Sequence, residues 1–241
     1  MAGHSKWSNI KRRKGAQDAK RGKIFTKLGR EIKIAVKEGG PDPTGNVRLS
    51  NVIAKARAAN MPNDTINNAI KSAMSAGDGD NYEEVVYEGY APKGVALIVT
   101  AATDNRNRTA SEVRHAFEKS GGNLGEPGCV QYNFDKKGVI GVEKEGLAYS
   151  EDEMMMLAIE AGAEDFNIHD EIYEILTDPQ DFAKVRLNLE EAGIKFTVAE
   201  IEMVPKMTVE LNEEEAEKFE AMIERLEDLD DVQNVYHNAE Y

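Results

Sequence analysis

The side chains best suited to chemistry lie at the start of the chain and are cationic. Residues 1–75 hold sixteen Lys and Arg side chains against five Asp and Glu, a net charge of +11. The remaining residues carry a net charge of −25, and the whole chain sums to −14. Such segregation is typical of proteins that bind phosphates, because Lys and Arg displace the counterions around them. The residues predicted to contact nucleic acid are Lys6, Trp7, Lys11, Arg12, Arg13, Lys14, Lys20, Arg21, Lys23, Lys27, Arg30, Arg48, Lys55 and Arg57.

A second polar group lies at residues 103–109, where a predicted strand ends and a predicted helix begins. Asp104 or Asn105 can cap this helix, and free backbone N–H groups of its first turn lie near Arg106 and Arg108. The junction suits a phosphate or an acidic loop of a partner. The alternative is a helix cap whose arginines hold acidic neighbours in place. Lys93, in a predicted hairpin turn, is expected nearby, so the second predicted site is Lys93, Asn105, Arg106 and Arg108.

Sequence signatures of catalysis are weak. The glycine-rich residues 121–125 lack the Lys-Ser/Thr of a phosphate-binding loop and precede a predicted strand. The four histidines are scattered without the spacing of a zinc site. Neither Ser111 nor Cys129 has the sequence context of an activated nucleophile. The sequence therefore predicts no catalytic residues, no metal and no cofactor, and a protein that is not an enzyme.

Three helices are predicted to position the cations of the first segment. Apolar residues recur at helical spacing over residues 18–38 and 46–59, and again from residue 63 to a stop at Gly77. Residues 1–15 show no apolar period and are predicted to form a flexible arm. These elements make up a basic helical domain at residues 1–78.

From residue 82 the apolar period shortens towards that of strands. Strands are predicted at 85–90, 94–100 and 129–134, with a helix at 106–120. Residues 135–205 then show the order β-α-β-β-α-β of a ferredoxin-like unit. The last elements are a strand at 207–211, a helix at 212–229 and a strand at 232–237; they lack a sheet of their own, so they are expected to pair with the strands before residue 135. The predicted fold is therefore multidomain α and α+β, in which residues 79–134 plus 206–241 form a discontinuous domain and 135–205 an inserted ferredoxin-like domain.

Composition excludes several classes of protein. No run approaches the roughly 18–20 consecutive apolar residues of a membrane span, so no membrane partner is expected. Cys129 is the single cysteine, which rules out an internal disulfide and suits a reducing compartment. The basic N-terminus is followed by no apolar stretch, unlike a secretory signal. We expect a cytoplasmic protein; the oligomeric state is open, with a monomer as the default.

Several stretches together resemble the YebC family of bacterial regulators, whose mitochondrial relatives activate translation of a cytochrome oxidase subunit. The resemblance covers essentially the whole chain and starts at residue 3, which leaves no room for a transit peptide and indicates a bacterial cytoplasmic member. One departure is Asn67-Asn68, where family members are usually charged. The stretches that carry the resemblance are 3–7, 60–66, 69–71, 87–90, 94–96, 103–114 and 121–125.

The resemblance implies a helical first domain, two α+β domains and a non-enzymatic role in gene expression. The family is described both as DNA-binding transcriptional regulators and as ribosome-associated factors that relieve stalling at proline-rich stretches. The first hypothesis is accordingly a nucleic-acid-binding regulator that grips phosphates of duplex DNA with its basic domain. The alternatives are a translation factor that binds ribosomal RNA on the ribosome, and a protein–protein adaptor. The basic segment could also pair with the chain's own acidic domains.

Overall fold

The computed structural model describes residues 17–75 and 81–241. The predicted arm, with Lys6, Trp7, Lys11, Arg12, Arg13 and Lys14, lies outside the described residues. The described chain divides into two compact units: residues 134–204 form one, and residues 13–133 with 205–241, apart from the undescribed segments, form the other. The fold is multidomain, with a helical domain followed by two α+β domains, as predicted. None of the described helices is long and apolar enough to cross a membrane.

Three helices form the first domain: α2 (Gln17–Gly39), α3 (Val47–Ala58) and α4 (Asn63–Ser75). Their apolar stripes meet in a core that includes Ile32, Leu49 and Ile66. Buried Asn46 joins the first two helices. Its Oδ1 accepts from the Leu49 N–H and caps α3, while its Nδ2 donates to the carbonyls of Ala35 and Gly40 at 2.7 and 2.8 Å.

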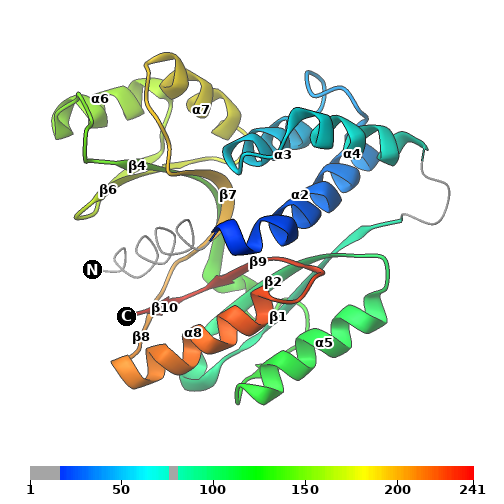
Figure 1. The fold of residues 1–241 in the computed structure, drawn as a ribbon. Coiled ribbons are helices and arrows are strands. Elements are labelled where there is room, and N and C mark those ends of the chain that lie inside the picture. Colours follow the sequence, from blue (N-terminus) through cyan, green and yellow to red (C-terminus); the bar gives the residue numbers. More distant parts are fainter. Residues whose placement is uncertain (1–16, 76–80) are drawn as a thin grey trace. The chain divides into compact units, whose positions relative to one another are not determined.

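A four-stranded sheet in the order β3-β1-β2-β9 forms the second domain. Its strands are β1 (Glu83–Tyr90), β2 (Ala96–Thr103), β3 (Asn123–Leu124) and β9 (Val232–His237). α5 (Arg106–Lys119) and α8 (Glu213–Glu227) lie side by side on one face (Figure 1). β9 pairs with β2 with Val235 opposite Val99, so the predicted pairing of the C-terminal strand with the earlier strands is confirmed.

Two strand predictions in this domain need correction. The segment predicted as a strand at 207–211 contains β8 (Val209–Glu210), which pairs in parallel with β10 (Ala239–Glu240) as a separate two-stranded sheet. The strand predicted at 129–134 is wrong: residues 127–130 form turns, and a short 3₁₀ helix follows at Gln131–Asn133. The reason is the buried carboxylate of Glu88, which accepts from the N–H groups of Gly128, Val130 and Gln131 at 2.7, 2.9 and 3.0 Å. Those amides are therefore unavailable to a neighbouring strand.

The inserted unit consists of β4 (Phe134–Glu143), α6 (Glu151–Ala161), β5 (Asp165–Ile168), β6 (Ile172–Thr177), α7 (Phe182–Glu191) and β7 (Val198–Pro205). Its sheet order is β5-β6-β4-β7, with β6 antiparallel to both β5 and β4. This is the β-α-β-β-α-β order predicted from the sequence. The two helices pack their apolar faces on Ile140 and Ile175, and Met154, the first of three consecutive methionines, lies fully in this core.

Candidate nucleic-acid interface

One face of α2 presents cations at positions 23, 27 and 30, a spacing that aligns them along the helix. They contact the end of α8 and the turn after it. Lys23 Nζ donates to the Asp228 carbonyl at 3.0 Å, and Lys27 Nζ donates to the Glu227 carbonyl at 2.7 Å. Arg30 Nη1 donates to the Asp230 carbonyl at 2.5 Å. The last carbonyls of a helix have no partner within the helix and attract cations. α2 therefore supplies part of the C-terminal cap of α8.

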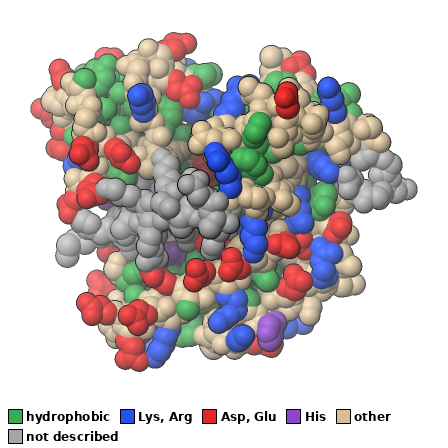
Figure 2. All heavy atoms as spheres, viewed as in Figure 1, with side chains coloured by type: hydrophobic (Ala, Val, Ile, Leu, Met, Phe, Trp, Pro, Cys, Tyr) green, Lys and Arg blue, Asp and Glu red, His purple; other side chains and the backbone are tan. Residues whose placement is uncertain are grey.

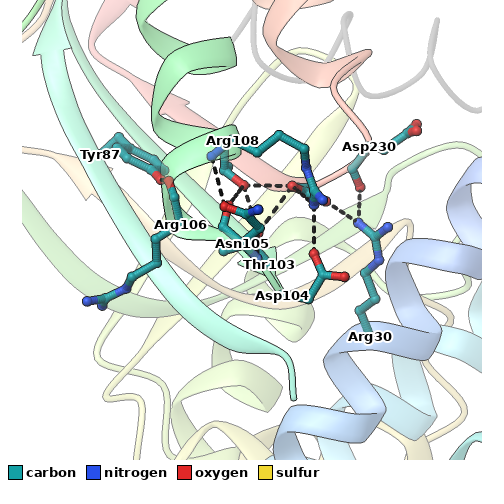
Figure 3. Close-up of polar contacts among 10 residues, drawn as sticks. Arg30, Tyr87, Thr103, Asp104, Asn105, Arg106, Arg108 and Asp230 are labelled. Carbon is teal, nitrogen blue, oxygen red and sulfur yellow. Dashed lines mark hydrogen bonds and ion pairs between the residues drawn. The ribbon is translucent and has the colours of Figure 1, made fainter. Parts of the chain in front are cut away.

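The carboxylate of Asp231 is the centre of this contact. Asp231 is 2 % exposed, and its carboxylate contacts both α2 and the start of α5. Its Oδ1 accepts from Arg30 Nη1 at 2.9 Å, and its Oδ2 accepts from Arg108 Nη2 at 2.7 Å and from the Thr109 hydroxyl at 2.6 Å. The hydroxyl of Thr103 donates to the same Oδ2 at 3.2 Å. In Figure 3, the side chains of Arg30 and Arg108 reach toward each other from α2 and α5.

The pKa of Asp231 lies below its ordinary value. Burial opposes ionisation of the carboxyl group, but the hydrogen bonds from Thr109 and Arg108 and the positive charges of Arg108 and Arg30 outweigh burial. The same contact raises the pKa of Arg108, first through its hydrogen bond to Asp231 and then through its bond to Asp104. Asp231 is therefore a charged group held in the interior by fully formed partners.

Most side chains of the second predicted site form hydrogen bonds or ion pairs within the chain. Asn105 caps α5 by accepting from the Arg108 N–H at 3.1 Å, and Arg108 also pairs with Asp104 at 2.8 Å. Arg106 points away from this cluster (Figure 3), with Nε 3.0 Å from a Glu83 carboxylate oxygen. The structure does not bring Lys93 to the junction. Lys93 lies before the other end of β2, in the 3₁₀ turn Pro92–Gly94, and pairs with Glu215 at 2.7 Å.

Apart from Lys33, whose Nζ lies 5.6 Å from the centre of the Tyr82 ring, the other described cations of the first domain fall into two groups. Arg48 is paired with Glu38 and Glu84 at 2.7 and 2.5 Å, and Lys55 lies 3.6 Å from Glu31. Lys20 belongs to α2, but its side chain lies outside the described part. The second group is exposed, and no ion pair joins its members to a described residue. Its members are Arg21, Lys37, Arg57 and Lys71.

Sequence reasoning missed the acidic turn that receives α2. Asp228, Asp230 and Asp231 follow directly on a helix C-terminus, where the helix dipole disfavours anions. That misplaced charge was a signal that cations from elsewhere in the chain would lie there. Figure 2 shows Lys and Arg side chains (blue) among Asp and Glu side chains (red) over α2 and the end of α8. Within the described ranges, no cluster of three or more His, Cys, Asp or Glu side chains could hold a metal ion.

Comparison with known proteins covers nearly the whole chain. A family model described as the TACO1/YebC protein N-terminal domain matches residues 5–76, and one described as the TACO1/YebC second and third domain matches residues 82–239. A probable transcriptional regulatory protein of Acetivibrio thermocellus is 61% identical over 99% of this chain and 98% of its own. One from Clostridium tetani is 56% identical over 100% of this chain and 98% of its own.

A solved structure gives the same result. The crystal structure of a conserved hypothetical protein from Aquifex aeolicus has a TM-score of 0.84 and 49% sequence identity, covering 92% of this chain and 91% of that one. Both α+β domains and the helical domain are thus matched in sequence and in fold. The chain belongs to the TACO1/YebC family.

Proposed function

We propose that the protein is a non-enzymatic regulator of gene expression that binds nucleic acid through the phosphates, using its basic helical domain. The relatives named above are called probable transcriptional regulatory proteins, which supports a regulatory role and makes duplex DNA the first ligand to test. The second ligand is ribosomal RNA, because phosphate recognition by Lys and Arg serves either polymer.

The observation that carries the proposal is the group of exposed cations on the helical domain that form no ion pair with any described residue. Arg21 lies near the start of α2 and Arg57 near the end of α3. The ion pair between Lys55 and Glu31 shows that the end of α3 lies beside the middle of α2. Arg21 and Arg57 are thus presented by neighbouring helices with their guanidinium groups open to solvent. Arginines in this state can contact phosphates without first breaking an internal bond.

The acidic α+β domains complement this arrangement. Residues 76–241 carry a net charge of −25 and repel phosphate, so binding is directed to the helical domain. The arm before residue 17 adds Lys6 and the basic residues 11–14 with Trp7. We also propose that the protein acts in the cytoplasm.

Salt dependence tests the proposal directly. The affinity for a labelled DNA duplex and for a ribosomal RNA fragment is measured by fluorescence anisotropy between about 50 and 200 mM salt. If about five phosphates are contacted, log K falls with log salt with a slope of about −4 to −5 on DNA. A flat dependence contradicts phosphate recognition. Complexes that survive nuclease treatment of a lysate would favour a protein–protein adaptor instead.

A further inference from the structure

The turn after α8 concentrates negative charge where a helix already has its negative end. α8 ends at Glu227 with Asp228 as its C-cap, and its last turn contains one basic residue, Arg225. Asp230 and Asp231 follow at once. Because carboxylates accumulate here beside carbonyls that have no partner within the helix, the turn 227–231 strongly attracts cations.

The cations that occupy the acidic turn 227–231 come from the face of α2 that would otherwise be open to a ligand. Lys23 is the most loosely held: its side chain is 48% exposed, and its Nζ lies 3.7 Å from an Asp228 carboxylate oxygen besides the carbonyl contact. Lys27 is more deeply placed. Burial lowers the pKa of Lys27 although Glu227, Asp230 and Asp228 favour its charged form. Its side chain is half-buried, and its ammonium group donates to the Glu227 carbonyl at 2.7 Å.

Arg30 is the most firmly held of the three. Its side chain is 16% exposed, it bonds both Asp230 and Asp231, and its guanidinium lies 5.2 Å from the centre of the Tyr82 ring. Exposed ion pairs are weak and buried ones are hard to break. The acidic turn 227–231 thus holds Arg30 more firmly than Lys23.

We propose that the acidic turn 227–231 is an internal competitor for nucleic acid, occupying Lys23 and Lys27 until a phosphate backbone displaces it. Arg30 stays on Asp231 and keeps α2 in place during the exchange. The inference rests on the proposed function and deepens it, because it makes the ligand-free protein autoinhibited. The carbonyl and carboxylate oxygens of the turn occupy the positions that phosphate oxygens would take.

If the turn competes with nucleic acid, it changes the slope with which the affinity for nucleic acid depends on salt. A cation paired within the protein carries few counterions, so transferring it to a phosphate releases fewer ions than transferring a free cation. Weakening the turn therefore has two effects together: tighter binding and a steeper salt slope.

The test compares two double variants that remove the same charge. Asp228→Asn with Asp230→Asn neutralises the turn and keeps its backbone carbonyls. Asp152→Asn with Asp181→Asn neutralises two exposed residues of α6 and the start of α7. We expect the first to bind a labelled DNA duplex about three- to tenfold more tightly than the second, with a log–log salt slope steeper by about one. The single variant Asp228→Asn, at an exposed position, serves if the double variant folds poorly.

The same measurements in a Lys23→Gln, Lys27→Gln background locate the effect. There, the difference between the two double variants should vanish, because the cations that the turn competes for are gone. If the two double variants bind equally well in the parent background, the turn does not compete with nucleic acid, while the proposed function stands. The same conclusion follows if the tighter binding persists in the Gln background. If the parent binds neither the DNA duplex nor the ribosomal RNA fragment, the proposed function is overturned, and the competitor with it.

Discussion

The guanidinium of Arg30 and the carboxylate of Asp231 meet at 2.9 Å although 201 positions separate them in the chain. Arg30 belongs to the helical domain, and Asp231 directly precedes β9 of the discontinuous α+β domain. The contact therefore joins a chemically basic and a chemically acidic part of one compact unit. Arg108 and Thr109 hold the other carboxylate oxygen, so the ion pair is fixed from both sides.

The first prediction concerns the stability that Asp231 provides. Replacing Asp231 by Asn leaves two arginines facing an uncharged group in the interior, which should lower the free energy of unfolding by about 3 kcal/mol. Urea unfolding followed by circular dichroism at neutral pH measures the loss. The matched control is Asp230→Asn at the exposed neighbouring position, which we expect to change little. A loss no larger than in the control would contradict the role given to Asp231.

The second prediction is the pH dependence of the same group. Folding holds the pKa of Asp231 below its ordinary value, so the folded state binds this proton less readily than the unfolded chain. The stabilisation is therefore present above the unfolded pKa of about 3.9 and is lost as the pH falls through the lower folded pKa. The difference in unfolding free energy between the parent and Asp231→Asn should shrink as the pH is lowered from 7 towards 3. A difference that stays constant over this range would contradict the assignment.

The third prediction concerns the loop folded around Glu88. A Gln at this position places an NH₂ group near N–H donors, so at least one of the amides of Gly128, Val130 and Gln131, of which that of Val130 is buried, loses its acceptor. An unsatisfied buried donor costs about 1–3 kcal/mol. Thermal unfolding should show a lower Tm for Glu88→Gln, whereas Glu126→Gln, in the same loop but exposed, should leave it nearly unchanged. Equal Tm values would mean that the Glu88 carboxylate does not hold the loop.

Local patterns predicted much of this fold. The three basic helices follow from apolar spacing alone, and so does the β-α-β-β-α-β order of the inserted unit. The strand expected at 129–134 failed because the apolar residues Val130 and Phe134 suggest a strand, while the backbone amides beside them bond a carboxylate about 40 positions away. A sequence pattern does not show such a distant acceptor.

Prediction of the candidate site was limited in the same way, by contacts between residues that are far apart in the sequence. The sequence identified Arg30 and Arg108 as cations of interest but placed them in separate sites, because Asp231 joins them only after β9 adds to β2. The sequence predicts that Lys93, in a hairpin turn, lies near Arg108. An extended strand of eight residues instead separates them.

The last prediction tests whether the exposed arginines of the helical domain bind phosphates, or whether net charge alone attracts them. If the proposed function holds, the double variant Arg21→Glu with Arg57→Glu loses two phosphate contacts and gains two repulsive charges. We expect the affinity for duplex DNA to fall by about tenfold or more at low salt and the salt slope to flatten by about two. Both positions are exposed, so the fold should persist, which circular dichroism checks.

A double reversal in the inserted unit, Lys184→Glu with Lys195→Glu, is the matched control for this experiment. Both lysines are exposed and belong to the ferredoxin-like domain, so the net charge changes equally while the helical domain is untouched. Because long-range charge is screened beyond about 10 Å at 0.1 M salt, the control should change affinity far less. If the two double variants weaken binding equally, the phosphates are attracted by net charge alone, and the helical domain is not the surface that binds them.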